Sequence, residues 1–208
     1  MEVENYIRKI KIPTSICVMS KRNSGKSVFV NDLVQQLLVN NKVDSVIVFS
    51  ATAMYNNDYK NIPKSHILQY SDNKIRQIMN LQKKKPVSQR NQVLVVLDDL
   101  LGSVKNSDEI LKLYSLGRHF NITPVLISQT ANRLISPTIK NNSDHMFISR
   151  LNRQQLTDLW KSCITNMSKK SFEHLVETLN KNFNFIAIDN TTQSNLPEDF
   201  LTICYAKI

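Results

Sequence analysis

Short apolar runs alternate with segments of helical periodicity along most of the chain. The runs carry hydrophobic residues at consecutive positions, a pattern that is typical of strands buried on both faces of a sheet. We therefore expect strands at residues 15–19, 45–49, 66–70, 93–97, 124–128, 145–149, 183–188 and 200–205.

Helices are predicted between these runs, where apolar residues recur every three or four positions. The clearest example is the segment 30–38, in which Val30, Leu33 and Leu37 share one face. Further helices are expected at about 75–85, ending before the proline at position 86, and at 110–117, 156–160 and 172–179.

This alternation indicates an α/β fold with a mainly parallel sheet and helices on both faces. The C-terminal strands are candidates for antiparallel pairing. A length of 208 residues fits a single domain, with a core at about 11–150 and residues 151–208 as an extension of it. In such folds, ligands bind at the carboxyl ends of the strands, which is where functional residues are expected.

A candidate phosphate loop follows the first predicted strand and leads into the helix at 30–38. Its sequence is Ser20-Lys21-Arg22-Asn23-Ser24-Gly25-Lys26-Ser27. The last three residues match the template G-x-x-x-x-G-K-[ST], and a serine replaces the first glycine. Gly25 lets the backbone wrap around phosphates, Lys26 places an ammonium group on them, and the Ser27 hydroxyl completes a Mg²⁺ shell. The stretch is therefore predicted to bind ATP and Mg²⁺; the alternative is a chance helix start with a serine cap.

Two acidic residues, Asp98 and Asp99, follow the predicted strand at 93–97. Phosphate-loop NTPases hold Mg²⁺ with an acidic residue at the end of such a strand, so Asp98 is the candidate on the metal side. A second carboxylate can orient and deprotonate the attacking water, which makes Asp99 the candidate general base. Aspartates also form local hydrogen bonds in turns, and that alternative stays open.

Gln129 and Arg118 are further candidates for catalysis. Gln129 follows the predicted strand at 124–128, where its side chain can contact the γ-phosphate or the attacking water. Arg118 follows Gly117 at the end of the preceding helix. Gln129 is also consistent with a polar residue leaving a strand, which is the better interpretation of an isolated glutamine. Arg118 is equally consistent with a cation that complements a helix dipole. Arg150 and Arg153 are rivals for any role of an arginine in a neighbouring active site.

Three segments together carry a resemblance to a known family. They are the phosphate loop, the acidic strand Val93–Asp99, and Gly117–Gln129, which reads GRHFNITPVLISQ. From about Lys11 to Asp189 the chain resembles the FtsK–HerA superfamily of DNA-pumping ATPases, and within it the poxvirus-type genome-packaging ATPases of large DNA viruses and virophages. This resemblance implies a RecA-like fold, with an extra strand between the phosphate-loop strand and the acidic strand.

The resemblance also implies roles for single residues. Lys26 and Ser27 would bind ATP phosphates and Mg²⁺, Asp98 would lie on the Mg²⁺ side, Asp99 would activate water, Gln129 would sense the γ-phosphate, and Arg118 would act as an arginine finger toward a neighbouring subunit. Members form rings, usually hexamers, that thread double-stranded DNA through a central pore. Such a protein would be virus-encoded, would work in the host-cell cytoplasm or viral factory or in the virion, and would dock on capsid vertex proteins.

The composition agrees with a polyanionic partner. Twenty-seven basic residues against 17 acidic ones give a net charge of +10. A DNA motor holds phosphates without reading bases, so dispersed lysines and arginines suit it. The basic clusters are Lys83–Lys85 with Arg90, and Lys169–Lys170; each is also consistent with a solvated surface.

Other sequence features exclude several classes of protein. No apolar run approaches the ~20 residues that are needed to cross a bilayer, so no membrane segment is expected. The three cysteines, Cys17, Cys163 and Cys204, lack the spacing of a disulfide framework or a zinc site and are expected to be reduced and mostly buried.

The leading hypothesis is an ATP-driven motor that moves double-stranded DNA into a viral capsid and hydrolyses ATP at the subunit interfaces of a ring. A small-molecule nucleoside or nucleotide kinase is one alternative, because it shares the phosphate loop and the chain length. A nucleotide-dependent assembly module with little turnover is another, suggested by the serine at position 20.

Overall fold

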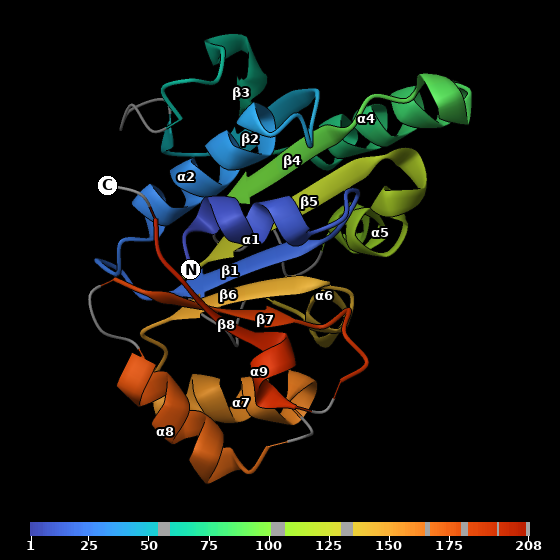
Figure 1. The fold of residues 1–208 in the computed structure, drawn as a ribbon. Coiled ribbons are helices and arrows are strands. Elements are labelled where there is room, and N and C mark those ends of the chain that lie inside the picture. The colour runs from blue at the N-terminus through green and yellow to red at the C-terminus, as the bar shows by residue number, and fades with distance from the viewer. Residues whose placement is uncertain are drawn as a thin grey trace.

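Eight strands form one sheet in a computed structural model of the chain, which describes residues 1–53, 59–100, 107–129, 135–164, 167–179, 183–194 and 196–206. Their order across the sheet is β3-β2-β4-β5-β1-β6-β7-β8 (Figure 1). The bounds are β1 Ile16–Ser20, β2 Ser45–Ser50, β3 Ile67–Leu68, β4 Val93–Asp98, β5 Ile122–Ser128, β6 His145–Ser149, β7 Phe185–Asp189 and β8 Leu201–Cys204.

The pairing of the strands confirms the predicted mainly parallel sheet. All neighbours from β3 to β6 run parallel, whereas β7 runs antiparallel to both β6 and β8. All eight predicted strands are present, although β3 has only two residues. β5 and β7 start two residues away from the expected positions, and the bounds of the remaining strands differ by at most one residue. β5 lies between β1 and β4, which is the extra strand that the family resemblance implies.

Helices cover both faces of the sheet, as predicted (Figure 1). Five of them correspond to expected helices: α2 Lys26–Val39, α4 Asp72–Lys84, α5 Asp108–Leu116, α7 Arg153–Cys163 and α8 Lys169–Leu179. The sequence interpretation missed the short helices α1 Val3–Lys9, α6 Pro137–Asn141 and α9 Pro197–Phe200, which have at most seven residues each. Such lengths are too short for a sustained apolar stripe to stand out.

The core consists of two apolar layers, one on each side of the sheet. In β1, Ile16 and Val18 belong to the layer beneath α1 and α2. Cys17 and Met19, which alternate with them, belong to the layer beneath α4 to α8. Because side chains alternate between the faces of a strand, a strand that is apolar throughout fills both layers at once.

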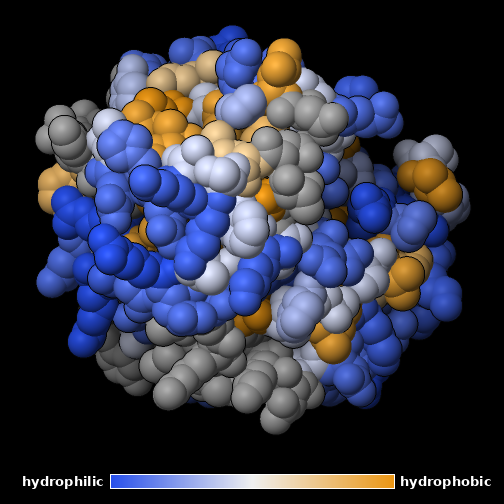
Figure 2. Space-filling view, turned by 90° about the horizontal axis from the view of Figure 1, so that it is seen from below, coloured by the Kyte–Doolittle hydropathy of each residue, from blue (hydrophilic) through white to orange (hydrophobic). Residues whose placement is uncertain are grey.

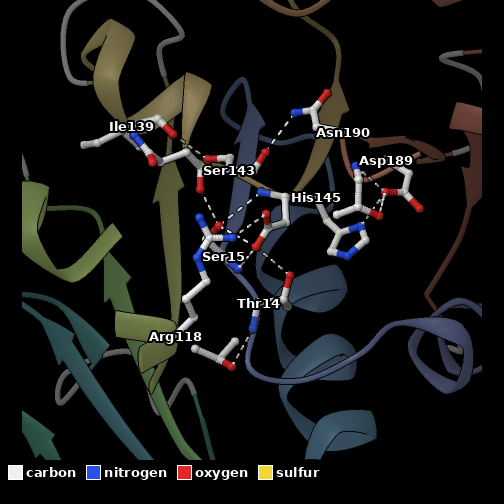
Figure 3. Close-up of polar contacts among 12 residues, drawn as sticks. Thr14, Ser15, Arg118, Ile139, Ser143, His145, Asp189 and Asn190 are labelled. Carbon is white, nitrogen blue, oxygen red and sulfur yellow. Dashed lines mark hydrogen bonds and ion pairs between the residues drawn. The ribbon is translucent and has the colours of Figure 1, made fainter. Parts of the chain in front are cut away.

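A polar cluster joins the amino ends of β1 and β6 (Figure 3). The carboxylate of Asp144, just before β6, accepts hydrogen bonds from Ser15 N (2.9 Å) and from the Thr14 hydroxyl (3.0 Å). The backbone of Asn190, just after β7, donates to the Asp144 carbonyl at 2.8 Å. These bonds fix the register of three adjacent strands at the edge opposite the phosphate loop.

The described residues include the side chains of two of the three cysteines, and their helices can be compared with the length of a membrane-spanning segment. Cys17 and Cys204 are buried and reduced, and the side chain of Cys163 lies outside the described part of the chain. Within the described ranges, no helix has both the length and the apolar character that crossing a membrane would require.

The packing of α2 generates a stability prediction. Phe29 lies in the first turns of α2, is 1 % exposed, and stacks on Phe185 of β7 with ring centroids 4.0 Å apart. We expect Phe29→Ala to lower the free energy of unfolding by about 3–5 kcal/mol, because it removes a buried aromatic ring and leaves a cavity. Denaturant unfolding would measure the loss. The control Val39→Ala, at a 63 % exposed position of the same helix, should change it by less than about 0.5 kcal/mol; equal effects would contradict this account of the core.

Candidate functional site

The carboxyl ends of β1, β4 and β5 meet at one edge of the sheet and surround a cleft of about 420 Å³. Nine of the residues predicted from the sequence line this cleft: Lys21, Arg22, Asn23, Gly25, Lys26, Ser27, Asp98, Asp99 and Gln129. They come from segments more than 100 residues apart, so the fold brings together the phosphate loop, the acidic pair and the glutamine.

The phosphate loop has the backbone that its sequence predicts. Gly25 is the N-cap of α2 and has a φ of 80°, a left-handed conformation that glycine adopts readily. The buried Ser24 hydroxyl donates to the Lys21 carbonyl at 2.7 Å and holds the turn together. Backbone N–H groups at the start of a 14-residue helix and the positive end of its dipole favour an anion at this position.

Ser20 occupies the position of the missing glycine and lies within β1. It pairs with Ser149 of β6 in extended backbone, a conformation that any residue can adopt. Ser20 is fully buried, and its hydroxyl has no hydrogen-bond partner among the described residues. The loop therefore bends after Ser20, and a serine fits there without strain.

Lys26 and Ser27 face Asp98 across the floor of the cleft, where all three border one small pocket. Burial lowers the pKa of Lys26, while the nearby carboxylates of Asp98 and Asp99 oppose that shift. A hydroxyl and a carboxylate are hard oxygen donors of the kind that Mg²⁺ uses together with substrate phosphates. The chemistry of this donor set therefore fits the predicted metal. Among the described residues, the cleft included, no group of three or more His, Cys, Asp and Glu side chains could hold a metal ion.

Tyr59 is a residue of this site that the sequence interpretation missed. Its hydroxyl donates to Asp98 Oδ2 at 2.9 Å, and the side chain is 5 % exposed. Nothing in the spacing of a tyrosine after the second strand connects it with an aspartate 39 positions later. Only the pairing of β2 with β4 brings the two residues together.

Asp99 and Gln129 are in direct contact. Gln129 Nε2 donates to Asp99 Oδ1 at 3.2 Å across the ends of β4 and β5. Asp99 has a φ of 49°, which is consistent with the turn that the alternative interpretation proposed, and the same turn directs its carboxylate toward the glutamine. A carboxylate held by an amide at the mouth of a phosphate site can position and deprotonate a water molecule.

Arg118 lies at the amino ends of the strands, opposite the cleft. It belongs to the 3₁₀ turn Gly117–Phe120 before β5, and its Nη1 lies 3.8 Å from Asp144 Oδ1 (Figure 3). Because β5 has seven residues, about 20 Å separate Arg118 from the cleft of its own chain. The side chain is 53 % exposed.

The two rival arginines lie nearer the phosphate loop. Arg150 follows β6 at the same edge as the loop, and its Nη1 donates to the Asn23 carbonyl at 3.3 Å. Arg153 begins α7 and forms an exposed ion pair with Glu177 at 3.9 Å.

Comparisons with known proteins agree with this arrangement. The profile of a family described as "Poxvirus A32 protein" matches residues 5–207. A protein of frog virus 3 (isolate Goorha), 015R, is 27 % identical over 186 residues, which are 86 % of this chain and 57 % of that protein. The chain thus spans little more than half the length of this relative.

Solved structures share the fold. The DNA-packaging ATPase B204 from Sulfolobus turreted icosahedral virus superposes with a TM-score of 0.70 at 16 % identity, covering 94 % of this chain and 98 % of that one. The genome-packaging NTPase B204 of Sulfolobus turreted icosahedral virus 2, in complex with ATP-γS, gives 0.65 at 14 % identity, with 93 % and 97 % covered.

The contact between Tyr59 and Asp98 generates a prediction about metal binding. Tyr59→Phe removes one hydrogen bond that orients the Asp98 carboxylate. Loss of such an outer contact typically weakens metal binding 10- to 100-fold, so we expect about tenfold more Mg²⁺ to be needed for half-maximal binding of a fluorescent ATP analogue. The matched control is Tyr70→Phe, which removes a hydroxyl bonded to Asp72 and Ser107 away from the cleft. Identical Mg²⁺ titrations for both variants would show that Tyr59 has no positioning role.

Proposed function

The chain belongs to the poxvirus A32 protein family, and from this premise we propose that it is a viral genome-packaging ATPase, a motor that hydrolyses ATP to move double-stranded DNA into a capsid. The observation that carries the proposal is the contact between Gln129 and Asp99 in the cleft that also contains Lys26 and Ser27. The B204 proteins, which share the fold, are packaging enzymes of other viruses.

In the proposed mechanism, the phosphate loop binds the triphosphate. Its backbone N–H groups and the start of α2 would hold the phosphates, and the Lys26 ammonium group would lie against the β- and γ-phosphates. Ser27 and Asp98 would hold Mg²⁺, and Tyr59 would keep the Asp98 carboxylate in place. When bound, Mg²⁺ neutralises charge on the β- and γ-phosphates and orients them.

Hydrolysis would depend on Asp99 and Gln129 acting as a pair. Asp99 would accept the proton of the attacking water at a carboxylate oxygen. Gln129 would orient that water and contact the γ-phosphate, and its bond to Asp99 would link the state of the phosphate to the position of the base. Gln129 directly follows β5, so a displacement of Gln129 would also act on this strand, at the other end of which Arg118 lies.

We assign Arg118 to the active site of a neighbouring subunit. Its distance of about 20 Å from the cleft of its own chain excludes a role there, and its exposure leaves it accessible to another chain. The family resemblance implies a ring of six subunits. In such a ring, the amino ends of the strands of one subunit would face the cleft of the next subunit. Cations that stabilise transferring phosphoryl groups are often supplied in this way.

The charge of the chain supports duplex DNA as the partner. Lys83–Lys85 at the end of α4 and Lys169–Lys170 at the start of α8 are exposed, and the net charge is +10. Figure 2 views the molecule from the side of α7 and α8, and hydrophilic residues predominate on this face. Dispersed lysines suit sequence-independent contacts with phosphates.

We infer further that the protein is virus-encoded, works in the host cytoplasm, viral factory or virion, and docks on capsid vertex proteins.

The first prediction of this proposal concerns turnover. We expect ATP hydrolysis to rise when duplex DNA is added, and the rise to shrink as salt screens the phosphate contacts. Asp99→Asn should lower the hydrolysis rate by about 10²- to 10⁴-fold because the general base is lost, while ATP binding persists. Lys26→Ala should weaken ATP binding itself. Steady-state phosphate release and equilibrium binding would measure these effects.

The exposed Lys64→Ala serves as a control and should retain both binding and turnover. A hydrolysis rate that does not respond to DNA at any salt concentration would contradict the motor. Phosphoryl transfer to a nucleoside or nucleotide would instead support the kinase alternative. Tight ATP binding with negligible turnover would support the assembly module.

The second prediction concerns the position of Arg118. If it acts in a neighbouring subunit, mixing Arg118→Ala subunits with wild-type subunits should reduce ATPase activity more steeply than in proportion to the mutant fraction. The same titration with Arg153→Ala, a rival arginine in an exposed ion pair, should give a linear or flat response. A proportional decrease for Arg118→Ala would place its effect within its own subunit.

A further inference from the structure

The geometry of the cleft defines a direction for a bound nucleotide. The reacting groups, Asp99 and Gln129, follow β4 and β5, which both lie on one side of β1 in the sheet. A γ-phosphate that reaches these groups from the phosphate loop points toward that side. The nucleoside end of the same molecule must then extend the other way, over the carboxyl end of β6 and the start of β7.

An arginine and a phenylalanine lie on that other side. Arg150 follows β6, and Phe183 precedes β7, which is antiparallel and therefore begins at the same edge. The Arg150 guanidinium carbon lies 4.8 Å from the centroid of the Phe183 ring, which is within the range of a cation–π contact. The same guanidinium donates to the Asn23 carbonyl at 3.3 Å.

The Phe183 ring lies directly against the phosphate loop. A methyl group built on Gly25 would be 3.1 Å from Phe183 Cδ1, so the ring borders the glycine that wraps around the phosphates. The ring therefore lies beside the phosphate loop, on the side of β6 and β7 toward which the nucleoside end would extend.

Phe183 is unusually placed for a phenylalanine. The chain has eight phenylalanines, all within the described ranges, and Phe183 alone is exposed, at 54 %. Its φ of 59° and that of Arg150, 49°, lie in the left-handed region that bulky residues avoid. An exposed aromatic ring in a strained backbone next to a functional site is more consistent with ligand contact than with packing.

We propose that Phe183, held against the phosphate loop by Arg150, is a stacking platform for the base of the bound nucleotide. This inference rests on the proposed function, because it takes the cleft to be a nucleoside triphosphate site. The ring offers a π-face and no hydrogen-bonding group, so the platform itself would accept any planar base.

Two triphosphates test the platform, one with a nucleoside and one without. Calorimetry would measure the affinities of ATP and of inorganic tripolyphosphate for the full chain and its variants. Stacking on an aromatic ring is worth about 1–3 kcal/mol per base, so Phe183→Ala should weaken ATP binding about tenfold. The affinity for tripolyphosphate should remain within about twofold of wild type, which also shows that the variant is folded. Phe183→Tyr, which keeps the ring, should retain the affinity for ATP.

A matched control lies at the other edge of the sheet. Phe120 also faces an arginine, Arg90, at 5.7 Å, and Phe120→Leu should leave both affinities unchanged. The platform is rejected if Phe183→Ala leaves ATP binding unchanged, or if it weakens ATP and tripolyphosphate equally, since Phe183 would then only support the loop. If wild-type protein binds neither ligand, the nucleotide site itself is wrong and the proposed function fails with it.

Discussion

The rest of the structure depends on the complete burial of β1 between β5 and β6. All five residues of this strand are inaccessible to solvent, so its backbone groups must pair within the sheet and its side chains must fill both apolar layers. One end is fixed by the bonds between Ser15 and Asp144. With the strand fixed, the loop that follows it has a defined position relative to the ends of β4 and β5, and the candidate phosphate site is assembled there.

The two edges of the sheet consequently carry different groups. The carboxyl edge gathers the phosphate loop, the acidic pair, Gln129 and Tyr59, whereas the amino edge holds Arg118 beside Asp144. A parallel sheet separates these edges by the length of its strands, and no side chain spans that distance. If Arg118 serves hydrolysis, the fold itself requires a second chain. A long contact of 3.8 Å to Asp144 orients the arginine at the surface without burying it.

Much of this arrangement could be predicted from the sequence, because it is encoded locally. Consecutive apolar positions predicted the strands, and the order of strand, loop and helix predicted a phosphate site whose residues the fold does bring to one cleft. The contacts between Tyr59 and Asp98, and between Arg150 and Phe183, join segments more than 30 residues apart and follow from strand order. The short helices α1, α6 and α9 lack the length for a clear periodicity. The position of Arg118 at the amino ends of the strands follows from its place before β5. The residues that it would contact belong to a neighbouring subunit, so the sequence of a single chain does not predict that contact.

Backbone conformation connects the scarcity of glycine with this site. Only three glycines occur in the chain, and among the described residues other than glycine the left-handed region is occupied by three asparagines, a residue type that tolerates it, and by four other residues. Those four are Tyr59, Asp99, Arg150 and Phe183. Asp99 belongs to the acidic pair and Tyr59 contacts it, whereas Arg150 and Phe183 border the phosphate loop. Strained backbone persists only where the surroundings hold it, and here it is concentrated at one edge of the sheet. Apart from Gly25, the left-handed positions at the cleft are therefore occupied by residues with side chains, and the backbone strain at these positions places those side chains where a nucleotide would bind.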